Sequence, residues 1–118
     1  MLAEIRAALI SDLSPLNVPV HIPWPDRVNP PCAIVGLEQG AYVVGGQTFG
    51  SFEVRMTVTL LVAKALADPV AALESLIELT LANTVDWALT GVDAPGTDTI
   101  SGMELLGTTI QLAKQSKL

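Results

Sequence analysis

Charged residues are scarce in this 118-residue chain, and their scarcity excludes several classes of protein. Only 15% of the residues are charged, whereas soluble globular proteins average about 25%. The net charge is -6 and the six basic residues are scattered, so we expect no basic patch that would hold nucleic acid phosphates. Half of the residues are hydrophobic, which excludes a disordered chain. Two interpretations remain: a small Ala-rich globule, or an obligate oligomer.

Cysteine and histidine occur once each, as Cys32 and His21. One cysteine cannot form an internal disulfide, and one histidine without partners at ligand spacing cannot build a zinc site. No apolar run reaches the roughly 20 residues that a membrane helix needs. Glu4 and Asp12 interrupt the place where a signal peptide would carry its apolar segment. We therefore expect a single soluble domain over residues 1–118, made in a cytoplasm and without a membrane partner.

Catalytic motifs are also missing from the sequence. Glu74 and Glu78 lie one helical turn apart, but no base or ligand accompanies them, so we interpret them as a solvated face. The segment GGQTFG (45–50) has the glycines of a phosphate loop without its lysine or its strand-to-helix setting. Cys32 has apolar neighbours, which predicts an inert core thiol. We expect no enzymatic activity, no cofactor and no metal site.

The most regular pattern that is present runs over residues 49–65, FGSFEVRMTVTLLVAKA. From Phe52 onward hydrophobic and polar residues alternate, until Leu61 and Ala63 break the polar side. A period of two predicts a strand buried on one face. Twelve strand residues at about 3.4 Å each span roughly 40 Å. A compact domain of this length is about 35 Å across, so we expect this strand to cross the whole domain.

Weaker patterns precede the long strand. Residues 2–13 predict a short amphipathic helix, which ends before Pro15. The segment VPVHIP (18–23) predicts an edge strand, because proline cannot donate to a ladder. Residues 32–39 predict a central strand that forms a hairpin with the long strand, and the glycine-rich residues 40–50 form its tip.

A second helix and a final strand follow. Asp68 suits the N-cap and Pro69 the first helical position, and the helical period continues to about Leu89. Residues 91–99 predict a turn, and the segment around Gly107 predicts strand on both sides of a kink, bulge or turn. The expected fold is α+β, with an antiparallel or mixed sheet of four to five strands and two helices on one face. The expected order is α-β-β-β-α-β, with a further strand if the chain turns at Gly107.

The hairpin tip carries apolar residues where a lone domain would place polar ones. A leucine also interrupts the polar side of the second helix. A ring requires a heterologous interface, in which one patch meets a different patch of the next copy. We predict that the tip contacts the second helix of a neighbouring subunit, through Tyr42, Val43, Val44, Phe49 and Leu79.

The order of these parts carries a resemblance over nearly the whole chain. Pro30 and Pro31 precede a strand, a glycine-rich hairpin and a helix follow, and the final segment contains Gly102 and Gly107. This arrangement resembles the small tail-terminator and head–tail joining (minor tail) proteins of long-tailed bacteriophages, the siphophages. The resemblance rests on arrangement and not on a diagnostic motif.

The resemblance implies a structural virion protein with no enzymatic activity and no cofactor. It implies a homohexameric ring that caps the tail tube, stops tail polymerisation and joins the head or neck. The implied partners are the chain itself, the tail tube protein and a head-completion or neck protein, while DNA passes through the lumen without specific binding. The implied location is the head–tail junction of the virion, after assembly in the host cytoplasm.

Three alternatives to a tail terminator remain open. Within the assembly class, the chain is another head–tail connector, a neck protein or a tail-tube protein. Outside it, the chain is a small-molecule-binding α+β domain with a concave pocket. An adaptor that binds an extended peptide along its edge strand is the third, although Pro19 and Pro23 would weaken that edge.

Overall fold

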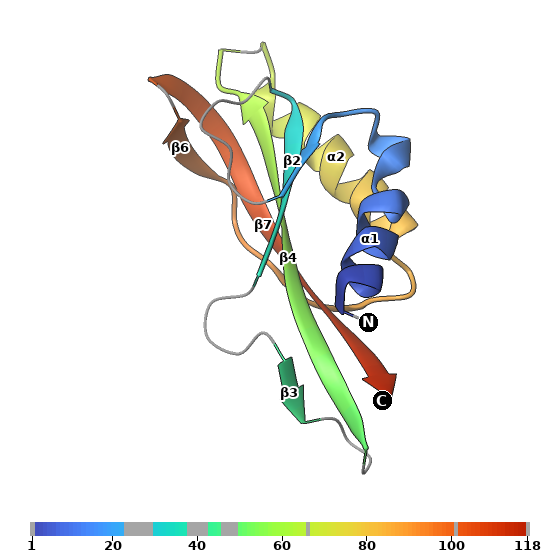
Figure 1. Ribbon diagram of the computed structural model, residues 1–118. Helices are drawn as coiled ribbons and strands as arrows, with labels where there is room; N and C mark the ends of the chain where they lie inside the picture. Colours follow the sequence, from blue (N-terminus) through green and yellow to red (C-terminus); the bar gives the residue numbers. More distant parts are fainter. Residues whose placement is uncertain are drawn as a thin grey trace.

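Two helices and a mixed β-sheet form an α+β fold in the computed structural model (Figure 1). The structure describes residues 2–22, 30–37, 43–45, 50–65, 67–100 and 102–117. The elements in chain order are α1 (Leu2–Asp12), a 3₁₀ turn (Ser14–Leu16), β1 (Val20–His21), β2 (Cys32–Leu37), β3 (Val43–Gly45), β4 (Ser51–Ala63), α2 (Pro69–Asn83), β5 (Ala88–Val92), β6 (Gly96–Ile100) and β7 (Met103–Lys117).

The sheet is built around β4 and β7. These strands pair antiparallel along the full length of β4, from Ser51 opposite Lys117 to Ala63 opposite Leu105. On the other side of β4 lie β2 and β3, and on the other side of β7 lie β5 and β6. The short β1 joins β2 in parallel, which makes the sheet mixed. The expectation of a strand over the alternating segment is confirmed, and that strand lies at the centre of the sheet.

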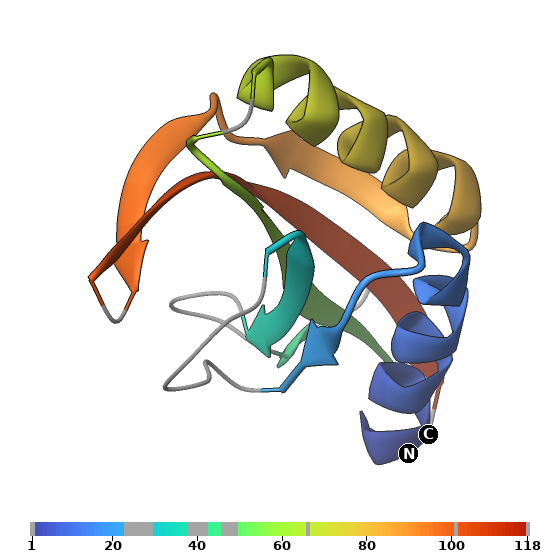
Figure 2. The same ribbon diagram turned by 90° about the horizontal axis from the view of Figure 1, so that it is seen from above.

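The alternation of β4 separates two hydrophobic clusters. On one face, β4 shares a cluster with buried residues of both helices, among them Leu9 of α1 and Leu73 of α2 (Figure 2). The β4 residues of that cluster are Val54, Met56, Val58, Leu60 and Val62. On the opposite face a smaller cluster explains why Leu61 breaks the polar side of the pattern, and it consists of Cys32, Ile34, Leu61 and Leu105.

The second helix is shorter than the sequence pattern predicts. It begins as expected, with Asp68 Oδ1 accepting a hydrogen bond from the Ala71 N–H at 3.1 Å. It ends at Asn83, and not near Leu89. The hydroxyl of Thr84 donates to the Thr80 carbonyl at 2.8 Å, and this side-chain bond competes with the backbone bonds that would continue the helix. The following residues form β5, because Ala88 to Val92 pair with β7.

The strand count and order also differ from the expectation of four to five strands. Seven strands join the sheet among the described residues. Four precede α2, because β3 lies within the predicted hairpin tip, and three follow it. The predicted turn over residues 91–99 contains parts of β5 and β6. The expected number of strands was therefore wrong both before and after α2.

Gly107 marks neither a turn nor a bulge, contrary to expectation. The pairing of β4 with β7 continues through it without a register shift, and Gly107 lies opposite Leu61. A Cβ atom at this position would lie 2.5 Å from Leu61 Cδ2 and 3.1 Å from the Leu60 carbonyl oxygen. Glycine is therefore needed for a close approach between β7 and β4, which is the other common reason for glycine in a strand.

The molecule is elongated, with principal extents of 50 × 27 × 23 Å. Its radius of gyration is 14.6 Å, against about 13.5 Å expected for a compact chain of this length. Figure 1 shows the cause: the first residues of β4 and the last residues of β7 project beyond the helices, with β3 beside them. We call this projection the arm, and it consists of residues 43–45, 51–53 and 115–117.

Candidate functional site

The predicted interface residues fall on two separate elements. Val43 lies in β3, opposite Val54, and its side chain is 42% exposed. Leu79 lies on α2 and is also 42% exposed. Tyr42 and Phe49 lie outside the described residues, and for Val44 only the backbone pairing with Glu53 is described. The structure therefore places two of the predicted side chains at the surface, on the arm and on α2, and does not bring them together.

A further apolar surface, missed from the sequence, surrounds β5. Val85 is 79% exposed, Leu89 50% and Val92 38%. These three lie within eight consecutive residues, whereas the other exposed large hydrophobic residues are more widely separated along the chain. In the sequence, Val85 and Leu89 fell within the predicted helix and Val92 within the predicted turn, so no strand was expected there. The strand signal was weak, because only Val85, Trp87 and Thr90 between Thr84 and Gly91 are β-branched or aromatic, and the stretch is short enough to fit either period.

No described strand pairs with the outer edge of β5, and this edge carries neither a charged residue nor proline. Natural edge strands are commonly blocked by proline, by charged residues or by extreme shortness. The edge strand β1 has two residues and follows Pro19, and β6 carries Asp98 at its centre. In contrast, β5 contains neither charge nor proline over Ala88–Val92. The uncharged β3 has an open outer edge too, since no described strand pairs with it except β4.

Side-chain contacts join β5, and the residue before it, to β7. Trp87 is 5% exposed and belongs to the main core, and the Lys114 ammonium lies 5.7 Å from the centroid of its ring. Such a cation–π contact contributes about 0.5–1 kcal/mol at an exposed site. The register shifts between Leu89 and Gly91, and the Thr90 hydroxyl donates to the Gln111 carbonyl at 3.1 Å. These contacts join β5 to β7 on either side of a local irregularity in their ladder.

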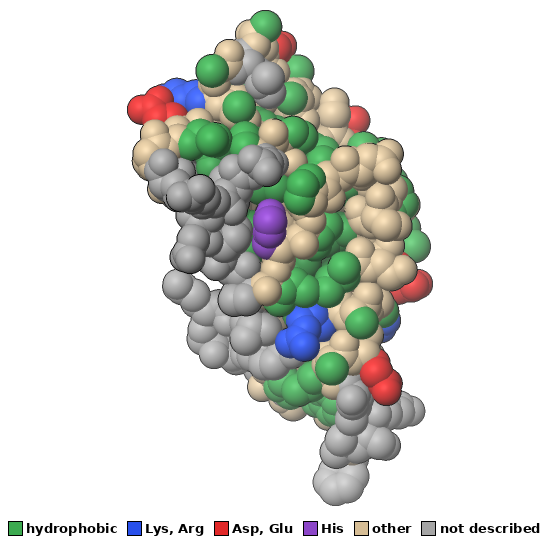
Figure 3. Space-filling model, turned by 45° about the horizontal axis from the view of Figure 1, so that its top comes forward, with side chains coloured by type: hydrophobic (Ala, Val, Ile, Leu, Met, Phe, Trp, Pro, Cys, Tyr) green, Lys and Arg blue, Asp and Glu red, His purple; other side chains and the backbone are tan. Residues whose placement is uncertain are grey.

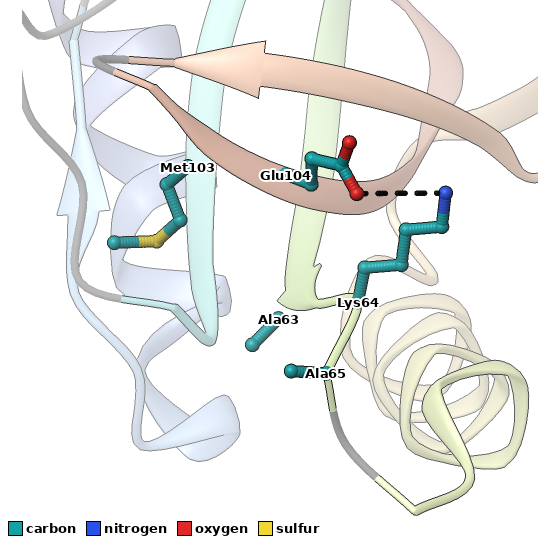
Figure 4. A pocket seen from close by; sticks show the side chains of 5 residues that line it. All are labelled: Ala63, Lys64, Ala65, Met103 and Glu104. Atoms are coloured by element: carbon teal, nitrogen blue, oxygen red, sulfur yellow. Dashed lines mark ion pairs between the residues drawn. The ribbon is translucent and has the colours of Figure 1, made fainter.

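The described surface has several open hollows, which differ in the polarity of their lining. One lies where β4 ends and β7 begins, and is lined by Ala63, Lys64, Ala65, Met103 and Glu104 (Figure 4). Lys64 Nζ lies 3.7 Å from Glu104 Oε2, and both side chains are exposed. An exposed pair of this kind contributes roughly 0–1 kcal/mol. This hollow offers a small apolar floor beside one ion pair, and no acid–base arrangement.

The structure locates the side chains that the sequence offered as candidates for chemistry. Cys32 is fully buried in the smaller cluster, which confirms its place in the core, and burial raises the pKa of its thiol. Glu74 and Glu78 are both exposed on α2. Within the described ranges, no three His, Cys, Asp or Glu side chains gather in a way that could hold a metal ion. His21 lies half-buried in the edge strand β1.

Comparison with known proteins adds no name to this surface. No protein-family model and no curated protein matches the sequence. None of the helices in the described part of the chain is long and apolar enough to cross a membrane. Hydrophobic side chains are exposed at several places on the face shown in Figure 3, and charged side chains there are few. The geometry thus offers binding surfaces along strand edges and on α2.

Proposed function

We propose that this chain is a tail terminator of a long-tailed bacteriophage: a structural virion protein that assembles into a hexameric ring. The ring caps the tail tube, stops tail polymerisation and provides the joint to the head or neck. Its partners are further copies of the chain, the tail tube protein and a head-completion or neck protein. The observation that carries the proposal is the presence of two open, uncharged strand edges on opposite sides of one sheet.

The surface chemistry supports assembly over catalysis. Nine large hydrophobic residues are exposed in the described part of the chain, and three of them flank or belong to β5. Exposed apolar side chains that cluster beside an open edge are typical of protein–protein interfaces. The low charge of the chain has the same explanation, because surface that is covered in an assembly needs fewer charges. The resemblance in element order adds the identity of the assembly.

The arm is the element that we assign to contact between subunits. Val43 and Val44 lie in its strand β3. The proposed contact also includes Tyr42 and Phe49, which lie outside the described residues, and Leu79 on α2 of the next copy. A projecting arm reaches a neighbour without disturbing the core, since the residues of β4 beyond Val54 already pack against both helices. The helices form one layer on the sheet in this proposal, and the opposite face remains for other partners.

Electron microscopy of negatively stained protein, alone and mixed with its tail tube protein, tests the proposal. A terminator forms closed rings, and these rings appear at the ends of tubes whose length they limit. Long tubes formed by this chain alone would instead identify a tail-tube protein. Monomers that neither form rings nor bind tube ends would contradict the assignment.

A second function, small-molecule binding, is favoured by one observation. A hollow of about 440 Å³ beside the start of β5 contains charged groups of both signs, Glu53, Asp86 and Lys114. Ligand pockets combine such groups with a deep apolar lining. The described residues that line this hollow include no aromatic side chain, and the nearby Trp87 is buried in the core. Thermal-shift screening with small anions and metabolites separates the two functions, because a terminator shows no saturable stabilisation.

A further inference from the structure

We infer that neighbouring copies join by strand pairing: the outer edge of β3 in one copy adds to the outer edge of β5 in the next. This inference deepens the proposed ring and rests on it. The partner at the open β5 edge is thus a second copy of this chain, and the contact is a continuous antiparallel ladder. Four features of the sheet lead to this assignment.

The first feature is strand direction. Three antiparallel steps lead across the sheet from β3 to β4, from β4 to β7 and from β7 to β5. The two outer strands therefore run in opposite directions. When two copies lie side by side with the same face forward, β3 of one meets β5 of the other antiparallel. That is the ladder used by every pair in this sheet except β1 with β2.

The second feature is the level of the two edges along the sheet. Val43 pairs with Val54, while Ala88 pairs with Ala113, which pairs with Arg55. In β4 numbering, β3 therefore covers positions 52–54 and β5 covers positions 55–58. Joining them requires a stagger of three to four residues per copy, which is roughly 12 Å. A constant stagger is the condition under which a tilted sheet closes on itself instead of extending without limit.

The third feature is the face on which the exposed apolar side chains lie. Directly paired residues of an antiparallel ladder point to the same face. Val43 shares its face with Val54, Leu89 with Leu112 and Val92 with Ile110, and these three partners all belong to the cluster under the helices. Across the proposed seam, Val43 of one copy and Leu89 and Val92 of the next lie on one face. A slip of one residue would separate them.

The fourth feature is edge chemistry. Both β3 and β5 are free of charge and proline, so neither edge repels an incoming strand. Pairing β5 with β5 of a second copy would give a two-fold dimer. It would satisfy the β5 edge and leave the β3 edge unpaired in both copies. Pairing the two different edges satisfies both, and a head-to-tail contact is the one from which rings are made.

Cysteine cross-linking tests the pairing directly. The starting chain is Cys32→Ala, which removes the native thiol and leaves no competing one. Val43→Cys and Leu89→Cys are introduced singly and together, and the full-length protein is treated with a short bifunctional thiol reagent. Within one chain these two positions are separated by β4 and β7, about three strand spacings or 14 Å, so a short reagent joins them only between copies. The matched control is Val43→Cys with Met103→Cys, because Met103 is exposed to a similar extent (42%, against 50% for Leu89) and lies at the other end of β7.

The expected result is a ladder of covalent multimers on a denaturing gel from the Val43/Leu89 double variant. Each single variant and the Val43/Met103 control remain monomeric on the same gel. A covalent dimer from Leu89→Cys alone would overturn the assignment in favour of two-fold pairing. Rings seen by microscopy in the same sample without a ladder would overturn the strand pairing and leave the proposed function standing. Neither rings nor ladder, with or without tube protein, would contradict both.

Discussion

Replacing Gly107 by alanine tests the close approach at the centre of the sheet. The added Cβ would lie 2.5 Å from Leu61 Cδ2 and 3.1 Å from the Leu60 carbonyl oxygen. Leu61 is fully buried, so its side chain has no free space into which to move, and the carbonyl belongs to the ladder between β4 and β7. Overpacking of this kind costs about 1–3 kcal/mol. We expect Gly107→Ala to lower the free energy of unfolding by about 2 kcal/mol.

Urea denaturation followed by circular dichroism measures this loss, and two further variants make it specific. Gly96 pairs directly with Gly107 from β6, and a Cβ there would meet nothing within 4 Å. Gly96→Ala should therefore change stability by less than about 0.5 kcal/mol. Leu61→Val removes the clashing Cδ atoms, so Gly107→Ala should cost less in that background than in the native chain. Equal stability of Gly107→Ala and Gly96→Ala would refute the reasoning.

Three further predictions concern the arm, the second helix and the buried thiol. Replacing both Val43 and Val44 by aspartate should leave a folded protein that no longer forms rings, and rings that persist in light scattering after size exclusion would contradict the assignment of the arm. Asp68→Ala removes the N-cap of α2 and should lower stability by about 1 kcal/mol, measured by urea denaturation; no change would mean that this bond contributes nothing. Because burial raises the pKa of Cys32, its thiol should resist alkylation at mildly alkaline pH in the folded protein and react quickly in urea, and fast labelling without denaturant would contradict its burial.

The parts of the fold that the sequence could predict are those in which one periodicity had no competitor. Alternation over residues 52–62 is long enough to exclude a helix, and β4 lies there. Asp68 and Pro69 marked the beginning of α2 because capping depends on local chemistry. Cys32 was placed correctly in the core, since its apolar neighbours are consecutive and belong to one central strand.

The errors arose where tertiary pairing decided between two local possibilities. Trp87 and Leu89 fit the helical period of α2. Trp87 nevertheless lies just before β5 and Leu89 lies within it, and β5 forms because its residues pair with β7. Gly107 was read as a break in the strand, whereas its reason is the side chain of Leu61 on a strand more than forty residues earlier. The short β3 was hidden inside a glycine-rich tip, because three residues are too few to show a period.

The candidate site follows the same division. An exposed apolar group on the hairpin was visible in the sequence as Val43, because the glycines around it marked a turn. The open edge of β5 was not visible, since the absence of a neighbour is a property of the whole sheet. Edge chemistry becomes meaningful only after the order of strands is known, which explains why Leu89 and Val92 emerged from the structure alone.

Native mass spectrometry of the purified, full-length chain tests the central claim most directly, because it counts the subunits of an assembly. We expect a single closed species, the hexamer, which is lost when Val43 and Val44 are replaced by aspartate. We also expect the Met103→Lys variant to form the same hexamer, because this substitution places a charge far from both strand edges. A monomer that stays monomeric in the presence of tube protein, or a continuous series of masses without a closed species, would contradict the account.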